Sequence, residues 1–409
     1  MNENESNNIL PPLPTAQQLD AIPLERKKAE IAPYLLDAKE DYPEPYYMLE
    51  YNGVPFSTLG GIQALSGQKK NGKTFVLAQL MAAILGTDIK TSRTPKFLPG
   101  LKVPMRTLEH LGHLPTVLYV DTEMEKLNSA KVLRRVHWLC GWPLDVPCER
   151  FHVLWLRGVT DTKDEQGKVE ERAFRKRYRL IMTAIDVLEP DAVFIDGIRD
   201  IIGDFNDNSE SAALVGELMA EAEKRQICIW NTLHMNPRPG NDDESKMRGH
   251  LGTELGNKIT DTLVSIKKKD ASGVVFTVKQ NDARGKDMED WRFEVTDDAG
   301  ALGIPRIMSG PEAVADEEQR ARIEADARFK TFNFPQTGAT YTDLEKHLRS
   351  QGITSNREIK RLFDEAKEAG ILVKNEKKKY RYNGFRPIPN DKTEDLPFAK
   401  PEGEENPPF

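Results

Sequence analysis

Two glycines, a lysine and a threonine occur at a spacing that could hold phosphate groups. They lie in Gly67-Gln-Lys-Lys-Asn-Gly72-Lys73-Thr74, where the glycines permit backbone angles and a close approach that a Cβ would block. Lys73 would add a positive charge to the outer phosphates, and the Thr74 hydroxyl could hold Mg²⁺. The alternative is a glycine-rich turn that binds no ligand. The pattern predicts an ATP site made of Gly67, Gln68, Lys69, Lys70, Asn71, Gly72, Lys73, Thr74 and Phe75.

A buried carboxylate is the second requirement of such a site, because Mg²⁺ needs a further oxygen ligand. Ala192-Val-Phe-Ile-Asp196-Gly197 supplies one, with four apolar residues before Asp196. Ligands bind at the carboxyl ends of parallel strands, which is where Asp196 is expected. Asp-Gly is also a turn pair, so Asp196 could simply end a strand. Together with Thr74 upstream, the pattern favours Asp196 as a Mg²⁺ ligand.

A further carboxylate is needed to polarise water if the triphosphate is hydrolysed. Val117-Leu-Tyr-Val-Asp121-Thr-Glu123 places two acidic residues after another apolar run. We predict that Glu123 is the general base, because it can project toward the γ-phosphate from the end of the strand. The alternatives are that Asp121 is the base, or that this segment caps the helix expected over 127–139.

His234 follows the apolar run Ile227–Trp230 and could contact the γ-phosphate and report its loss to the next loop. The alternative is a loop histidine without a role. The loop that follows, expected over residues 236–253, is basic at its tip and suits phosphodiester contacts, which makes it a candidate contact for DNA. A solvated loop is the other interpretation. Its basic residues are Arg238, Lys246, Arg248 and His250.

Two cations, Lys279 and Arg284, follow the strand-like run Val274–Val278. A subunit interface could place either of them on a neighbour's γ-phosphate, where a cation stabilises the charge of the transition state. The alternative is a basic turn on the surface. We therefore expect a homo-oligomer in which one of these two residues completes the site of the adjacent subunit.

The elements that must position these residues are short apolar strands alternating with amphipathic helices. This alternation predicts an α/β fold with a mostly parallel sheet and helices on both faces. The last two strands are joined by a short link, which predicts an antiparallel hairpin at the sheet edge. The expected strands are 62–65, 116–120, 151–156, 192–195, 227–230, 262–266 and 274–278, and the expected helices are 126–139, 170–188 and 211–225.

The composition excludes several classes of protein. The 409 residues suffice for two or three domains, and the net charge of −7 says nothing directly about nucleic acid. The three cysteines form no C-x-x-C pair, which favours free thiols over a disulfide or zinc site. The N-terminus has no basic and apolar signal pattern, and the longest apolar run is too short to span a bilayer. We expect a cytoplasmic protein with no membrane partner.

The C-terminal part resembles a small DNA-binding unit. Helix-start signatures occur at Thr342-Asp-Leu-Glu345 and Ser355-Asn-Arg-Glu358, followed by a basic segment at Lys377-Lys-Lys-Tyr-Arg381. Helix, turn, helix and a basic hairpin are similar to a winged helix, which could place one helix in a DNA groove. A protein docking module is the alternative. The predicted divisions are a partly disordered segment 1–44, a nucleotide domain 45–308, a charged helical linker 309–338, a winged-helix-like domain 339–386 and a disordered tail 387–409.

The order of these motifs resembles the RecA/DnaB superfamily of P-loop ATPases, and within it the AAA_25 or RepA-type branch of hexameric helicases. The matching residues are the phosphate loop, Glu123, Asp196, His234, the Arg248-Gly-His-Leu-Gly segment and the pair Lys279 and Arg284. The resemblance covers roughly residues 45–300 and implies a RecA-like fold, ATP hydrolysis with Mg²⁺, and a ring or filament that holds single-stranded DNA near its axis.

We therefore predict an ATP-hydrolysing motor that acts on DNA, specifically a replicative or mobile-element helicase of the RepA type. Two other functions remain open at this point. One is a recombination or repair ATPase that does not unwind DNA. The other is a DNA-binding replication initiator or regulator that uses ATP as an assembly switch.

Overall fold

The computed structural model describes residues 14–87, 95–235, 246–270, 273–283, 285–308, 322 and 324–384. The chain divides into two compact units, one ending at Pro45 and the other beginning at Tyr46. In the first unit, helices α1 (Ala16–Asp20) and α2 (Leu24–Ile31) and the short η1 (Ala32–Tyr34) contain no buried residue. No helix of the described residues is both long and apolar enough to cross a membrane.

A nine-stranded sheet organises the second unit, with the strand order β14-β13-β12-β11-β3-β10-β9-β5-β6. The six strands from β11 to β6 in this order are parallel to their neighbours, whereas the pairs β11/β12, β12/β13 and β13/β14 are antiparallel. The strands are β3 (Ile62–Gly67), β5 (Val117–Asp121), β6 (Phe151–Trp155), β9 (Ala192–Asp196), β10 (Cys228–His234), β11 (Asp261–Asp270), β12 (Gly273–Ala283), β13 (Trp291–Thr296) and β14 (Ile304–Ile307).

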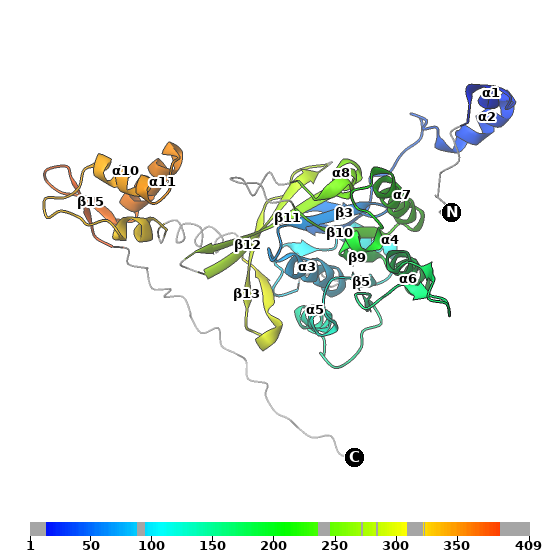
Figure 1. Cartoon of the computed structure of the whole chain (residues 1–409), viewed down its shortest axis with the longest axis horizontal. Coiled ribbons are helices and arrows are strands. Elements are labelled where there is room, and N and C mark those ends of the chain that lie inside the picture. Colours follow the sequence, from blue (N-terminus) through cyan, green and yellow to red (C-terminus); the bar gives the residue numbers. More distant parts are fainter. Residues whose placement is uncertain are drawn as a thin grey trace, which may run out of the picture. The chain divides into compact units, whose positions relative to one another are not determined.

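Helices cover both faces of this sheet (Figure 1). Alternating strand residues divide the core, because successive side chains of a strand point to opposite faces. Val117 and Tyr119 lie in the cluster with α3 (Lys73–Gly86) and α5 (Lys126–Leu139). Leu118 lies in the other cluster, with α6 (Ala173–Leu188), α7 (Asn208–Arg225) and α8 (Gly249–Lys258). The predicted α/β fold with a mostly parallel sheet and helices on both faces is confirmed.

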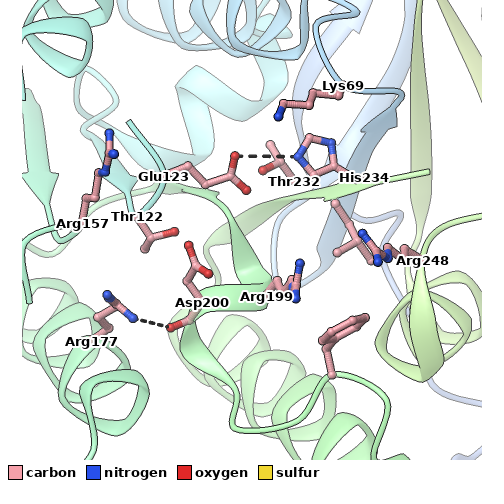
Figure 2. Close-up of a pocket in the computed structure, with 12 residues that line it drawn as sticks. Lys69, Thr122, Glu123, Arg157, Arg177, Arg199, Asp200, Thr232, His234 and Arg248 are labelled. Atoms are coloured by element: carbon pink, nitrogen blue, oxygen red, sulfur yellow. Dashed lines mark hydrogen bonds and ion pairs between the residues drawn. The ribbon is translucent and has the colours of Figure 1, made fainter. Parts of the chain in front are cut away.

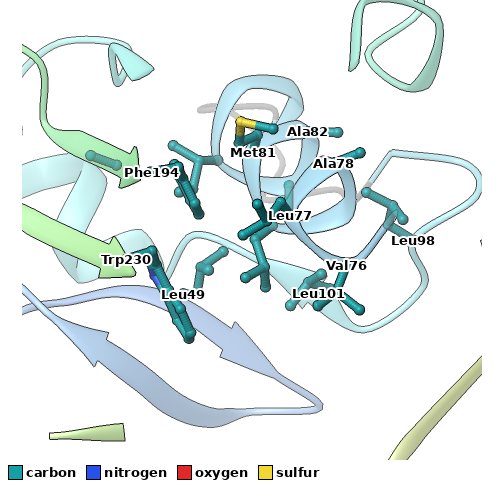
Figure 3. Packing of buried hydrophobic residues seen from close by; sticks show 14 of the residues in the cluster. Leu49, Val76, Leu77, Ala78, Met81, Ala82, Leu98, Leu101, Phe194 and Trp230 are labelled. Carbon is teal, nitrogen blue, oxygen red and sulfur yellow. The ribbon is translucent and has the colours of Figure 1, made fainter. Parts of the chain in front are cut away.

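Helix α3 is buried over ten consecutive residues, from Val76 to Leu85. Figure 3 shows Leu77 and Met81 of this helix packed near Phe194 and Trp230 of the sheet. Burying a leucine or methionine side chain contributes roughly 1.5–3 kcal/mol, so the helix is firmly anchored. The N-terminus of α3, which begins at Lys73, therefore has a fixed position relative to the strands.

The other strands correct one expectation and form a smaller three-stranded sheet, β2-β1-β4. The hairpin of β11 and β12 does not form the sheet edge, because β13 and β14, which the sequence patterns did not reveal, continue the sheet beyond it. In this smaller sheet, β4 (Leu101–Lys102) pairs with β1 (Tyr47–Tyr51). Strand β1 also pairs with β2 (Val54–Thr58). The remaining elements here are α4 (Met105–Leu111), β7 (Thr162–Lys163), β8 (Val169–Glu171), η2 (Ile198–Ile201) and η4 (Gly300–Leu302).

The C-terminal residues 324–384 have a core of their own, which includes Leu362 and Phe363. It contains α10 (Tyr341–Ser350), α11 (Asn356–Glu368) and the paired strands β15 (Leu372–Lys374) and β16 (Tyr380–Tyr382). Ser355 caps α11 as predicted, but α10 is capped by Thr340 and not by Thr342. The winged-helix identity and the proposed domain boundaries stay predictions, and the tail 387–409 lies outside the described residues.

Candidate nucleotide site

The predicted phosphate loop joins β3 to α3 at the carboxyl edge of the sheet. The ends of three other strands meet it there, because Gly67 pairs with His234 in the register of β3 and β10, and Asp121 pairs with Asp196 in the register of β5 and β9. A pocket of about 390 Å³ lies at this edge. It is lined by Lys69, Lys70, Asn71, Gly72, Lys73, Thr74, Phe75, Glu123, Asp196, His234, Lys267 and Phe276.

The two glycines of the loop are required by close neighbours. Gly67 has φ of +156°, and a Cβ there would lie 2.7 Å from the carbonyl oxygen of Ser265. Gly72 has φ of +82°, and a Cβ there would lie 2.6 Å from the Phe276 ring. The Ser265 hydroxyl also donates a hydrogen bond to the carbonyl of Asn71. Strands β11 and β12 therefore brace the loop, a role that the sequence did not reveal.

Lys73 points back into its own loop. Its Nζ donates to the carbonyl oxygens of Gly67 and Gln68 at 3.2 and 3.3 Å and lies 3.0 Å from His234 Nδ1. Burial lowers the pKa of Lys73, while Asp196 and Glu123 act in the opposite direction. A lysine held at the loop among carbonyl dipoles and carboxylates is placed to exchange these contacts for phosphate oxygens.

Asp196 ends β9 as predicted, and its two carboxylate oxygens each accept a hydrogen bond from a buried hydroxyl. Tyr119 Oη lies 2.9 Å from Oδ2, and Thr232 Oγ1 lies 2.7 Å from Oδ1. Burial raises the pKa of Asp196, and the Thr232 hydrogen bond opposes this shift. The sequence predicted the carboxylate but not these two residues, although each lies in an apolar strand where a hydroxyl needs a partner.

Asp121 and Glu123, the two candidate bases, differ in burial and in hydrogen bonding. Asp121 is fully buried and accepts hydrogen bonds from the backbone N–H groups of Glu123 and Met124 and from the Ser129 hydroxyl. It therefore holds the turn that carries Glu123. The Glu123 side chain is 41% exposed and lines the pocket. Burial, followed by the charges of Asp196 and Asp200, raises the pKa of Glu123 to about 7.

His234 lies between Lys73 and Glu123, as Figure 2 shows for the pair with Glu123. The Lys73 ammonium can only donate, so Nδ1 accepts and the proton of the neutral ring is on Nε2. That Nε2 lies 3.9 Å from Glu123 Oε2. Burial and then the charge of Lys73 lower the pKa of His234, which is consistent with a neutral ring.

The loop after β10 was expected to end at residue 253, but α8 already begins at Gly249. Residues 236–245 of this loop, which include Arg238, lie outside the described part of the chain. Met235 pairs with Met247, and the Arg248 N–H donates to the His234 carbonyl at 3.0 Å. Residues 249–253 therefore belong to α8.

Of the two cations predicted to act on a neighbour's γ-phosphate, the structure describes Lys279. Lys279 is a residue of β12, and its Nζ lies 3.9 Å from Asp290 Oδ2. Strand β12 is an interior strand and not the edge strand that the sequence suggested. Arg284 lies outside the described residues. Their role across an interface stays a prediction.

Comparison with known proteins finds similarity only among solved structures. No protein-family model matches the sequence, and no curated protein matches it. Among solved structures, a KaiC-like protein of the hyperthermophilic archaeon Pyrococcus horikoshii is similar, with 13% sequence identity and a TM-score of 0.39 over 65% of this chain and 99% of that chain. A likeness of this size carries no argument about the fold or the function of the present chain.

Proposed function

We propose that this protein binds ATP with Mg²⁺ and hydrolyses its terminal phosphoanhydride bond. The observation that carries the proposal is the meeting of Lys73, Glu123, Asp196 and His234 around one pocket beside a glycine loop at a helix N-terminus. The loop glycines are held against Ser265 and Phe276, which preserves a backbone that phosphates could approach closely.

The oxygen ligands at this pocket suit Mg²⁺. The Thr74 hydroxyl and the Asp196 carboxylate would hold the ion together with phosphate oxygens and water, because Mg²⁺ keeps several waters and uses few protein ligands. When bound, the ion would neutralise charge on the phosphates.

Glu123 is the residue that we assign to water activation. Its carboxylate is held at the pocket by the turn that Asp121 organises, and a pKa near 7 suits a base that takes up a proton at neutral pH. Asp121 is less suited to that role because its oxygens are occupied by Glu123, Met124 and Ser129 within the core. Lys73 would bind the outer phosphates, and His234 would contact the γ-phosphate.

We further propose that hydrolysis drives movement on DNA, as in a RepA-type helicase ring. The backbone supports a link between the two activities, since the Arg248 N–H bonds to the carbonyl of His234. A displacement of His234 would therefore also move Arg248, the residue just before α8. Lys279 or Arg284 would complete the site of a neighbouring subunit. DNA-stimulated ATPase and strand-displacement assays distinguish this helicase from an ATPase that does not unwind DNA.

Substitution of the proposed base tests the enzymatic assignment. Glu123→Gln keeps the size and hydrogen-bonding reach of the side chain but removes the base, so we expect normal ATP binding and a turnover reduced by about 10²–10⁴-fold. ATP binding and phosphate release are measured in the same preparations. Glu109→Gln, an exposed glutamate of α4, is the matched control. Turnover of Glu123→Gln at the level of Glu109→Gln would remove Glu123 from this role.

A further inference from the structure

A second cavity of about 470 Å³ adjoins the nucleotide pocket and shares Lys69, Glu123 and His234 with it. Figure 2 shows four arginines around it, contributed by the segments after β6, β9 and β10 and by α6. Among the described residues that line it, Glu123 and Asp200 are the acidic ones, so cations outnumber carboxylates there. The arginines are Arg157, Arg177, Arg199 and Arg248.

Two of these arginines are already occupied. Arg177 donates to the backbone carbonyls of Leu156, Val159 and Asp200, at 3.0–3.2 Å, and so joins the segments after β6 and β9. Arg157 lies 3.2 Å from Glu125 Oε1. Both therefore shape the cavity wall and add positive charge without being the groups best placed to bind a ligand.

The other two arginines share one aromatic ring. The Cζ of Arg199 lies 4.2 Å from the Phe205 ring centroid, and that of Arg248 lies 5.8 Å from it. The ring is held in place, because the Leu251 N–H donates to the Phe205 carbonyl and a Cβ on Gly249 would lie 2.6 Å from the ring. Two guanidinium groups on one ring repel each other because both are positively charged. A bound anion that contacts both groups would offset this repulsion.

Neither of these arginines is neutralised by the part of the chain that the structure describes. Both side chains are exposed, and within that part no carboxylate forms an ion pair with Arg199, Arg248 or Lys69. Guanidinium groups bind phosphate oxygens through paired N–H donors, which gives both strength and geometry. The cluster thus has the chemistry of an anion site that adjoins the phosphate loop and shares Lys69 with it.

We propose that Arg199, Arg248 and Lys69 form a second site for a phosphate group that is not part of the bound nucleotide. The group has two possible sources. One is orthophosphate released from ATP, because the cavity adjoins Glu123 and His234, and this source rests on the proposed function. The other is a phosphodiester of single-stranded DNA, whose binding needs no hydrolysis. In either case the Arg248 backbone links occupancy of this site to His234.

Direct binding measurements test the site and separate the two sources. Radiolabelled orthophosphate is titrated into the full chain loaded with ADP and Mg²⁺, and a fluorescent oligo(dT) is titrated without nucleotide. Arg199→Gln and Arg248→Gln should each weaken binding about tenfold, since each removes a charge-assisted contact. Arg134→Gln, an exposed arginine of α5 outside the cavity, should bind like the wild type. ADP binding is measured in every variant.

Each result decides the proposal. Weakened orthophosphate binding alone assigns the site to the reaction product, weakened oligonucleotide binding alone assigns it to DNA, and loss of both shows that it takes either. The proposed site would be wrong if both variants bound orthophosphate and oligo(dT) with the affinity of the wild type. It would also be wrong if the wild type bound neither ligand. If ADP does not bind the wild type, the ATPase proposal fails, while the oligonucleotide titration still tests the arginines.

Discussion

Tyr119→Phe should weaken the response to Mg²⁺ while leaving the fold intact. The phenyl ring of Tyr119 is fully buried and would remain, so only the hydroxyl that donates to Asp196 Oδ2 at 2.9 Å is lost. A hydrogen bond to a charged group contributes about 1.5–3 kcal/mol, and partners of metal ligands typically affect metal affinity by about 10–100-fold. We therefore expect the half-saturating Mg²⁺ concentration to rise by about 10–100-fold.

Thr232 offers a second version of the same test. Its hydroxyl donates to Asp196 Oδ1 and accepts from the Gly197 N–H at 2.8 Å, so Thr232→Val removes one donor and leaves a buried N–H without its acceptor. Thr232→Ser keeps the hydroxyl and should restore most of the Mg²⁺ response. A loss that serine does not restore would indicate altered packing and not altered support of Asp196.

The assay is ATPase rate against Mg²⁺ concentration at fixed ATP, combined with Mn²⁺ binding in the presence of ADP followed by electron paramagnetic resonance. The binding measurement does not depend on turnover. Tyr382→Phe is the matched control, because it removes a tyrosine hydroxyl that donates to Asp326 at 2.7 Å in the C-terminal unit. If folded Tyr119→Phe shows the same Mg²⁺ and Mn²⁺ dependence as Tyr382→Phe, the reasoning about Asp196 is wrong.

Two further predictions concern the base and the loop. Because the pKa of Glu123 in the nucleotide-free site is raised to about 7, the carboxylate is protonated below that pH, and kcat/KM for ATP should fall about tenfold from pH 8 to pH 6. A pH profile that is flat in the wild type over this range would contradict this. Gly72→Ala should weaken ATP binding by at least about tenfold, because a Cβ at φ of +82° would also meet Phe276. Gly112→Ala, at φ of +69° with no neighbour within 4 Å and outside the nucleotide pocket, is the control for a glycine of similar φ elsewhere in the chain, and equal ATP affinity in the two variants would contradict the prediction for Gly72.

Much of this site could be predicted because its residues follow apolar runs that end at the same sheet edge. The pattern before Asp196 predicts both a strand and the position of a carboxylate at its end, and the structure places Asp196 there. The spacing of Gly67, Gly72 and Lys73 likewise predicts a loop between a strand and a helix, which β3 and α3 form.

The groups that support the site were not predictable, because their partners are distant in sequence. Ser265 and Phe276 brace the phosphate loop from some 200 residues further along the chain, and only the sheet order brings them together. Phe205 shows the same limit, since nothing in its neighbourhood of the sequence indicates that Arg248 packs against its ring. Local periodicity carries no information about such pairings.

We infer that a triphosphate and its Mg²⁺ bind where β3 meets α3. A crystal structure of the full chain with a non-hydrolysable ATP analogue and Mg²⁺ tests it most directly. We expect the β- and γ-phosphates to lie against the loop from Gly67 to Thr74, with Lys73 Nζ moved from the loop carbonyls onto phosphate oxygens and the ion beside Thr74 and Asp196. An analogue bound elsewhere, or a loop in which Lys73 keeps its contacts to Gly67 and Gln68 at saturating analogue, would contradict it.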